Sequence, residues 1–211
     1  MERVLTADEV PEILAATNER IEPFAVGFVK IIGQEDDAVP AGSGTLVTAA
    51  GRHGILTADH VLKELPNSGE FGLVLPITGP EARLHRFRLD AGRVRKIRVA
   101  KASYDRMGPD LGLLMLRAPD VAKLETTKTF YNLGKRREWM LSNPPSIDRG
   151  GWFLVGMAAE WTSDLVPNRA FTRVKGFRGL CGAGVVKAER SAGNYDYLDY
   201  EAKYSEEYEG P

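Results

Sequence analysis

The chain has a single cysteine, Cys181, among its 211 residues, so it cannot form an intramolecular disulfide. Secreted proteins of this size commonly depend on disulfides, whereas proteins of reducing compartments rarely carry them. The N-terminal residues 1–10 lack the apolar core of a signal peptide. No apolar run is long enough to span a bilayer. We therefore expect a cytoplasmic protein that does not act at a membrane.

The chain also lacks an excess of charge of one sign, because 28 Lys and Arg oppose 29 Asp and Glu. Nucleic-acid binding needs a concentrated positive field, so no nucleic-acid partner is expected. The one basic stretch, residues 83–101, alternates with apolar residues and is interpreted as the solvated face of two strands. Histidine is scarce, no two histidines share a ligand spacing, and neither CxxC nor HExxH occurs, so no metal or cofactor is predicted. His53 and His85 have no motif around them and are interpreted as surface residues.

Two short segments each carry one ionisable residue at the edge of an apolar strand. Residues 54–62 read G-I-L-T-A-D-H-V-L, which predicts a buried strand followed by a helical turn with His60 facing outward. Residues 109–115 read P-D-L-G-L-L-M, in which the proline break leads into Asp110 and an apolar central strand. An unpaired carboxylate beside such a strand is costly, so we expect Asp110 to have a fixed hydrogen-bond partner.

These segments resemble those of a known family. L-T-A-D-H-V at 56–61 resembles the histidine block of trypsin-like (chymotrypsin-fold) serine peptidases, and D-L-G-L-L at 110–114 resembles their aspartate block. A-G-S-G-T-L-V at 41–47 is similar to the glycine strand that precedes the histidine in bacterial members. Taken singly, His60 and Asp110 have ordinary structural explanations as a satisfied histidine and a cap. The three blocks together, in this order, favour the roles that these residues have in the family.

The resemblance implies an all-β, chymotrypsin-like double β-barrel of the bacterial intracellular type. We expect a short N-terminal helical extension at 1–22, a first β-barrel with His60 and Asp110 at 23–118, and a linker with a partial second β-barrel at 119–211. Alternating apolar residues and turn signals place the strands of the first, closed barrel at 24–32, 42–49, 54–57, 71–77, 84–89, 94–100 and 111–116. Those of the second barrel are expected at 151–156, 170–177, 182–187 and 196–202. A helix is expected from a capping box at residues 6–9 to about Arg20, and another within 119–128.

The nucleophile has two candidates. The first is Cys181, because G-L-C-G-A-G at 179–184 can be laid over the G-x-S-G-G-P block of the family, with the thiol in the place of the serine. A thiol beside an imidazole is readily activated, and the glycines would free N–H groups for an oxyanion hole. However, the segment between Gly156 and Cys181 has room for one strand, where the family has two.

The second candidate is a serine beyond Pro211. In this register, residues 171–186 supply the second strand or a hairpin, residues 195–202 supply the third, and the acidic loop 205–211 leads to a nucleophile that this chain does not contain. Cys181 is then a small core hydrophobe. The spacing favours this register.

The resemblance implies an endopeptidase that acts on a polypeptide substrate. His60 would be the general base, Asp110 would orient its imidazole, and the serine or Cys181 would attack the peptide carbonyl. A chain without an attacking group would instead be a non-catalytic module that binds a protein partner. For the peptidase, an imidazole nitrogen of His60 is expected within about 2.6–3.2 Å of an Asp110 carboxylate oxygen.

Overall fold

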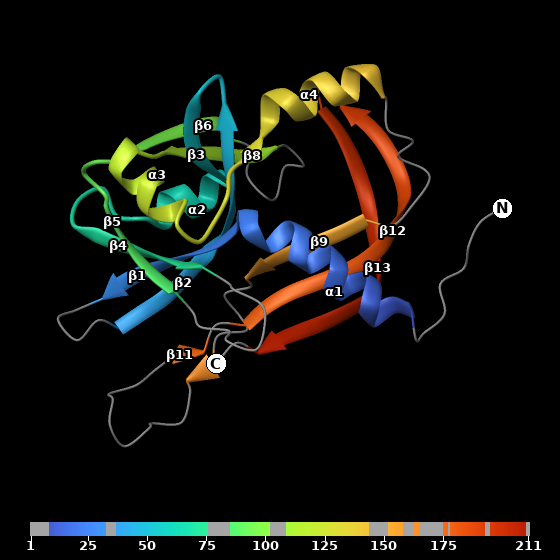
Figure 1. Cartoon of the computed structure of the whole chain (residues 1–211), viewed down its shortest axis with the longest axis horizontal. Coiled ribbons are helices and arrows are strands. Elements are labelled where there is room, and N and C mark those ends of the chain that lie inside the picture. The colour runs from blue at the N-terminus through green and yellow to red at the C-terminus, as the bar shows by residue number, and fades with distance from the viewer. Residues whose placement is uncertain are drawn as a thin grey trace.

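The computed structural model describes the chain at residues 9–32, 37–75, 85–101, 109–143, 152–157, 163–164, 175–176, 178–192 and 195–209. These residues form a mostly antiparallel β protein with few helices (Figure 1). The all-β class predicted from the sequence is therefore confirmed. None of the described helices is long and apolar enough to cross a membrane.

The main sheet has antiparallel strands in the order β5-β4-β1-β2-β3-β7-β6. Their bounds are Ala25–Ile32 (β1), Asp37–Ala49 (β2), Arg52–Thr57 (β3), Glu70–Leu75 (β4), His85–Asp90 (β5), Arg95–Lys101 (β6) and Asp110–Met115 (β7). Each of them overlaps one of the strands expected for the first barrel. A short strand, β8 (Tyr131–Asn132), adds to β2 in parallel.

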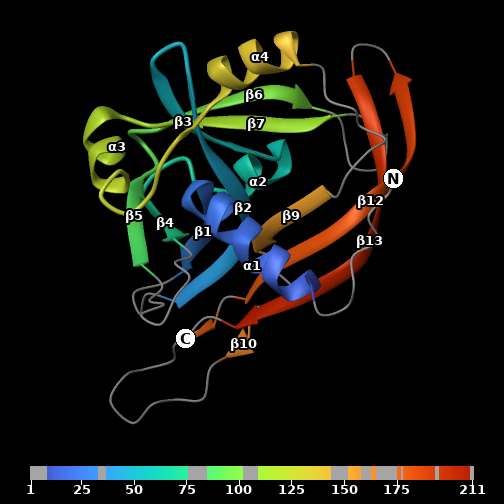
Figure 2. The ribbon, with the colours of Figure 1, turned by 45° about the vertical axis from the view of Figure 1, so that its right-hand side comes forward.

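The sheet curls, because its two end strands are neighbours in the chain. β5 and β6 are joined by residues 91–94 alone, so the ends of the sheet must approach each other, and the sheet forms a half-barrel (Figure 2). The expected closed barrel is wrong in one respect, since no ladder joins β5 to β6 among the described residues. The turn explains this: the Asp90 carboxylate accepts a hydrogen bond from Gly92 N (2.9 Å), and Asp90 O accepts one from Arg93 N (3.0 Å). These bonds redirect the chain instead of pairing the two strands.

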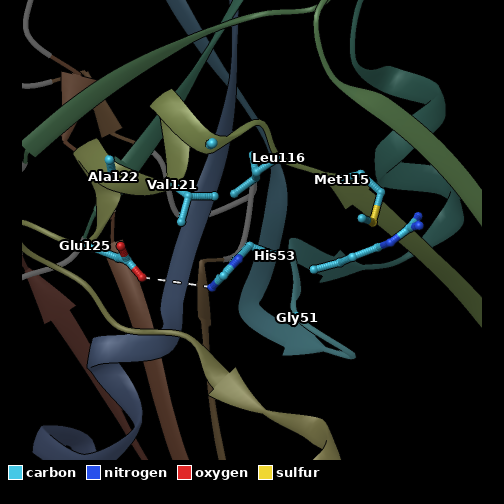
Figure 3. A pocket seen from close by; sticks show the side chains of 9 residues that line it. Gly51, His53, Met115, Leu116, Val121, Ala122 and Glu125 are labelled. Carbon is cyan, nitrogen blue, oxygen red and sulfur yellow. Dashed lines mark ion pairs between the residues drawn. The ribbon is translucent and has the colours of Figure 1, made fainter.

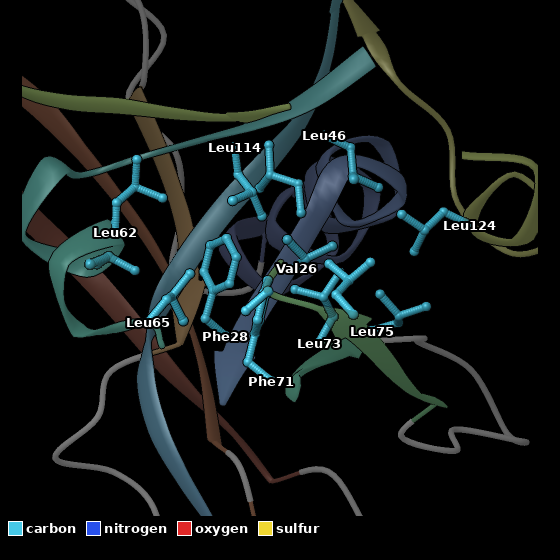
Figure 4. Packing of buried hydrophobic residues seen from close by; sticks show 14 residues of the cluster. Val26, Phe28, Leu46, Leu62, Leu65, Phe71, Leu73, Leu75, Leu114 and Leu124 are labelled. Atoms are coloured by element: carbon cyan, nitrogen blue, oxygen red, sulfur yellow. The ribbon is translucent and has the colours of Figure 1, made fainter. Parts of the chain in front are cut away.

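The core fills the concave side of this sheet (Figure 4). On β4, Phe71, Leu73 and Leu75 point inward at every second position, as the two-residue period of a strand requires. The buried cluster consists of Val26, Phe28, Leu46, Ile55, Val61, Leu62, Leu65, Phe71, Leu73, Leu75, Leu89, Ala91, Leu114 and Leu124. Leu124 belongs to the segment expected to be a linker, so that segment packs on the main sheet.

The described helices are α1 (Glu9–Ile21), the 3-10 turn η1 (Glu22–Phe24), α2 (Asp59–Glu64), α3 (Ala118–Leu124) and α4 (Leu133–Ser142). The first matches the expected N-terminal helix, and α3 matches the expected helix within 119–128. Sequence analysis missed α4. Its signal is Asn132, whose side chain accepts a hydrogen bond from Lys135 N (2.9 Å) as the N-cap.

A second sheet has the order β13-β12-β9, with β9 at Trp152–Met157, β12 at Arg178–Ala192 and β13 at Tyr195–Glu209. β10 (Ser163–Asp164) and β11 (Lys175–Gly176) form a separate pair. The expected strand at 170–177 lies outside the described residues except at β11. The strands expected at 182–187 and 196–202 are parts of much longer strands.

The acidic loop expected at 205–211 is wrong as far as Glu209. These residues continue β13, with Ser205 opposite Gly182 and Glu209 opposite Arg178. The reason is that β12 extends back to Arg178 and offers ladder partners over this whole length. Charged side chains are tolerated on a strand that has a neighbour on only one side. The described sheet has β13 at its edge.

We predict that Leu114→Ala destabilises the chain by about 2–5 kcal/mol, because Leu114 is fully buried in β7, a strand paired on both sides. Denaturant unfolding measures the change. Val99→Ala on the neighbouring β6 is the matched control, since that side chain is 53% exposed and its truncation should cost little. A loss of less than about 1 kcal/mol for Leu114→Ala would show that the site collapses around the smaller side chain.

Candidate active site

Helix α2 presents His60 to solvent. β3 ends at Thr57, whose hydroxyl donates to Ser43 O (2.6 Å), and the helix begins after Ala58. Val61, Leu62 and Leu65 enter the core and so turn one side of α2 toward the sheet. The side chain of His60 lies on the other side and is 63% exposed. This matches the expectation of an outward-facing histidine on a helical turn.

Two glycines lie beneath α2 and allow the helix to pack close to the sheet. Gly42, in the glycine strand, has a φ of +138°, which favours glycine, and a Cβ there would meet Val61. A Cβ at Gly112 would overlap the side chain of Leu62 and would lie 3.5 Å from the Cα atom of Asp59. Both positions therefore require glycine for α2 to lie this close to β2 and β7. The glycine strand noticed in the sequence thus contributes directly to placing His60.

Asp110, the first residue of β7, accepts two hydrogen bonds from His60. Its Oδ2 pairs with the imidazole Nδ1, and its Oδ1 accepts the backbone N–H of His60 (3.1 Å). The N-cap residue of α2, Ala58, has no side-chain cap. Asp110 therefore caps the helix from another strand while it holds the imidazole. The predicted contact between His60 and Asp110 is confirmed, as is the fixed partner for the carboxylate.

The surroundings of Asp110 favour its ionised form. Burial alone would raise the pKa of this carboxyl, because only 16% of the side chain is exposed. The hydrogen bonds from the side chain and backbone of His60, together with one from the backbone of Asp59, outweigh burial and lower its pKa below the ordinary value. An ionised Asp110 accepts a hydrogen bond from Nδ1–H, which leaves the lone pair of Nε2 directed away from the carboxylate.

Asp59, next to His60, is a fully buried carboxylate that sequence analysis did not single out. Arg98 on β6 binds it with two nitrogens, Nε to Oδ1 (2.5 Å) and Nη2 to Oδ2, and Lys63 Nζ lies 3.2 Å from Oδ2. The hydrogen bonds from Arg98 lower the pKa of Asp59 to about 2 against the opposing effect of burial, and Lys63 adds to them. An acidic residue inside the apolar block at 54–62 was the available signal.

The basic stretch is more than a solvated face. Besides Arg98, Lys96 enters the structure and donates to Leu65 O (2.6 Å), Pro66 O (2.9 Å) and Asn67 Oδ1 (3.0 Å). Burial lowers the pKa of Lys96. Two basic residues of this stretch therefore hold α2 and the loop after it, which corrects the interpretation of residues 83–101 as solvated side chains only.

A cavity of about 590 Å³ lies at the other end of β3 (Figure 3). His53 and Glu125 face each other across it, with Nε2 and Oε1 4.0 Å apart, and apolar side chains such as Leu116 and Val121 line its wall. The ring of His53 also packs edge-on against Phe130 at 4.8 Å between centroids. His53 is partly exposed, and its side chain lines this cavity. The side chain of His85 lies outside the described residues.

Cys181 lies in the middle of a strand. Its backbone is opposite Val155 of β9 on one side and Glu206 of β13 on the other. Its side chain is outside the described residues. Among the described residues, no group of His, Cys, Asp or Glu side chains is arranged to hold a metal ion.

No family model matches this sequence, and no curated protein is significantly similar to it. Function therefore rests on the residues and geometry of the candidate site.

We predict that neutral His60 carries its proton on Nδ1, because Asp110 accepts from that nitrogen. ¹⁵N-edited imidazole spectra at alkaline pH would measure the tautomer, with His53 and His85 as internal references. Asp110→Asn should shift His60 toward the Nε2–H form, because the amide no longer demands a donor at Nδ1. A wild-type His60 protonated mainly on Nε2 would contradict this arrangement.

We predict that the stability contributed by Asp59 is lost in acid. Its pKa in the folded chain, about 2, is lower than the ordinary value of 3.8, so its contribution is present above pH 4 and disappears as the pH falls toward 2. The difference in unfolding free energy between wild type and Asp59→Asn should therefore be widest above pH 4 and should narrow in acid. Urea unfolding across that range measures the difference. If the difference in unfolding free energy did not change with pH, Asp59 would not be ion-paired.

Proposed function

We propose that this chain carries the catalytic His–Asp pair of a trypsin-like endopeptidase, which hydrolyses peptide bonds with a nucleophile–His–Asp triad. The observation that carries the proposal is the imidazole of His60, which is hydrogen-bonded through Nδ1 to the carboxylate of Asp110, the first residue of β7. Nδ1 is occupied, and the exposed imidazole can offer Nε2 to a reacting group. The three sequence blocks that resemble the family lie together around this pair.

For the fold we propose a chymotrypsin-like double β-barrel whose second barrel is incomplete. Two observations support it. The curled main sheet carries both His60 and Asp110, and the separate antiparallel sheet β13-β12-β9 follows it in the chain. The two sheets meet where β9 contacts β1 and β2, with Gly156 beside the side chain of Ser43. A family peptidase would build its active site across such a junction.

In the proposed reaction, His60 Nε2 takes the proton of the attacking group as that group adds to the peptide carbonyl. The imidazolium that forms is stabilised by the adjacent Asp110 carboxylate, which stays ionised because its pKa is lowered. The same Nε2–H then donates the proton to the leaving amine. A polypeptide is the substrate, and the single cysteine of the chain suggests a reducing, cytoplasmic setting.

For the nucleophile we propose a serine outside residues 1–211. Cys181 is disfavoured because its backbone lies between two ladder partners, β9 and β13. An attacking residue needs neighbouring N–H groups that are free to bind the oxyanion, and in a strand paired on both sides those groups are committed to the ladders.

The second candidate function is a non-catalytic module that binds a protein partner. One observation favours it: within the part of the chain that the structure describes, Asp110 is the only hydrogen-bond partner of the His60 imidazole. A chain without an attacking group keeps the pair and the sheet but cannot cleave.

We predict that Cys181 of the folded chain reacts with iodoacetamide no faster than in the unfolded chain and that His60→Ala does not change the rate, because a thiol without an activating base has no lowered pKa. Mass spectrometry over time measures the reaction, and the urea-unfolded chain supplies the reference rate. Rapid alkylation that falls in His60→Ala would instead make the protein a compact cysteine peptidase.

The coding sequence that follows Pro211 separates the remaining two functions. If an in-frame G-x-S-G-G follows, the longer protein should hydrolyse an unfolded protein substrate, and His60→Ala should lower kcat by a factor on the order of 10³ or more. Lys30→Met, which removes only an exposed ion pair with Glu64, is the matched control. If no serine block follows and neither hydrolysis nor rapid alkylation is observed, the chain is a non-catalytic module.

A further inference from the structure

Asp59 is buried at a point where the neighbouring side chain is exposed. Its side chain has no exposed surface, whereas that of His60 is largely in solvent. A fully buried carboxylate is costly unless it is paired and hydrogen-bonded with good geometry. Here the guanidinium fork of Arg98 supplies two nitrogens, which fixes both distance and direction.

The pairing of β6 with β7 also places Arg98 beside the glycine over which α2 packs. Arg98 lies opposite Gly112, the residue that the helix packs against, and Gly112 is two residues from Asp110 in the same strand. The register of β6 shifts directly after Arg98, with Val99 as the extra residue. Bulges of this kind often re-aim side chains next to active sites. Figure 2 shows α2 beside β7 and β6.

The apolar contacts of α2 do not fix its orientation by themselves. Val61 and Leu62 pack over Gly42 and Gly112 and so fix the distance between the helix and the sheet. Hydrophobic contacts are non-directional, so they leave small rotations of a six-residue helix unopposed. The ion pair between Lys30 and Glu64 is exposed, and such pairs constrain geometry weakly. Besides the hydrogen bonds from His60 to Asp110, the directional contact on α2 next to His60 is the Arg98 fork on the buried Asp59 carboxylate.

We propose that Arg98 is a positioning residue, whose fork on Asp59 fixes the rotation of α2 and thereby presents Nδ1–H of His60 to Asp110. This inference rests on the proposed function of the His60–Asp110 pair. Arg98 does not touch the reacting atoms and acts through Asp59. The positive charge of Arg98 and the negative charge of Asp110 also attract each other.

The test is the tautomer of His60 in folded protein, measured by ¹⁵N-edited imidazole spectra of Arg98→Met, Arg98→Lys and the control Lys30→Met. A merely stabilising Arg98 would leave this ratio unchanged as long as the chain stays folded. We expect the ratio of Nδ1–H to Nε2–H to fall by about tenfold in Arg98→Met, because the loss of one well-aligned hydrogen bond to a charged group shifts an equilibrium by about that factor or more. Lys30→Met should match wild type.

Arg98→Lys keeps the charge but lacks the fork, so it remains informative if Arg98→Met fails to fold. We expect a tautomer ratio below that of wild type. A wild-type ratio in folded Arg98→Lys would overturn the positioning role, as would a wild-type ratio in folded Arg98→Met. These outcomes differ from failure of the proposed function, which would be seen as the absence of hydrolysis and of a serine block while the tautomer of wild-type His60 stayed the same.

Discussion

The carboxylate of Asp110 holds a helix and an imidazole at the same time, and the candidate site depends on this double contact. Helix α2 has no side-chain cap of its own, so the backbone N–H of His60 is satisfied from β7. The other carboxylate oxygen takes the imidazole. The same carboxylate therefore contacts both the side chain of His60 and the start of the helix.

Different interactions set the distance of α2 from the sheet and the rotation of the helix on it. Burial of Val61 and Leu62 stabilises the helix against the sheet by about 1.5–3 kcal/mol for each side chain. Exposed ion pairs such as that of Lys30 with Glu64 contribute little, because solvent screens the two charges. Apolar packing over the two glycines thus sets the distance of α2 from the sheet. The polar contacts of Asp110 and Asp59 set its rotation.

Features that depend on a local sequence pattern could be predicted from the sequence. The turn residues around β4 and the apolar run of β7 predicted strands that are present, and the two motif blocks predicted the contact of His60 with Asp110. Features that depend on register were not predictable. Arg98 meets Asp59 only because β6 pairs with β7 at Gly112 before its register shifts, and no spacing rule gives that alignment.

Other differences have the same origin. The extension of β13 to Glu209 follows from the length of its partner β12, so its own acidic composition suggested a loop. The absence of pairing between β5 and β6 follows from the turn at Asp90, where the side chain accepts a hydrogen bond from Gly92 N. The spacing of apolar residues along the chain does not predict such a bond. Helix α4 buries none of its residues, so it has no apolar face for a pattern to reveal.

The pairing of β3 with β7 has a consequence for the order of folding. Thr57 lies opposite Gly112, so the ladder that aligns His60 with Asp110 joins segments about fifty residues apart in the chain. Contacts between distant segments form after the intervening loop has closed, which makes them slow compared with local hairpins such as β2–β3. We therefore expect the imidazole and the carboxylate to come into contact late in folding, after the local hairpins have formed.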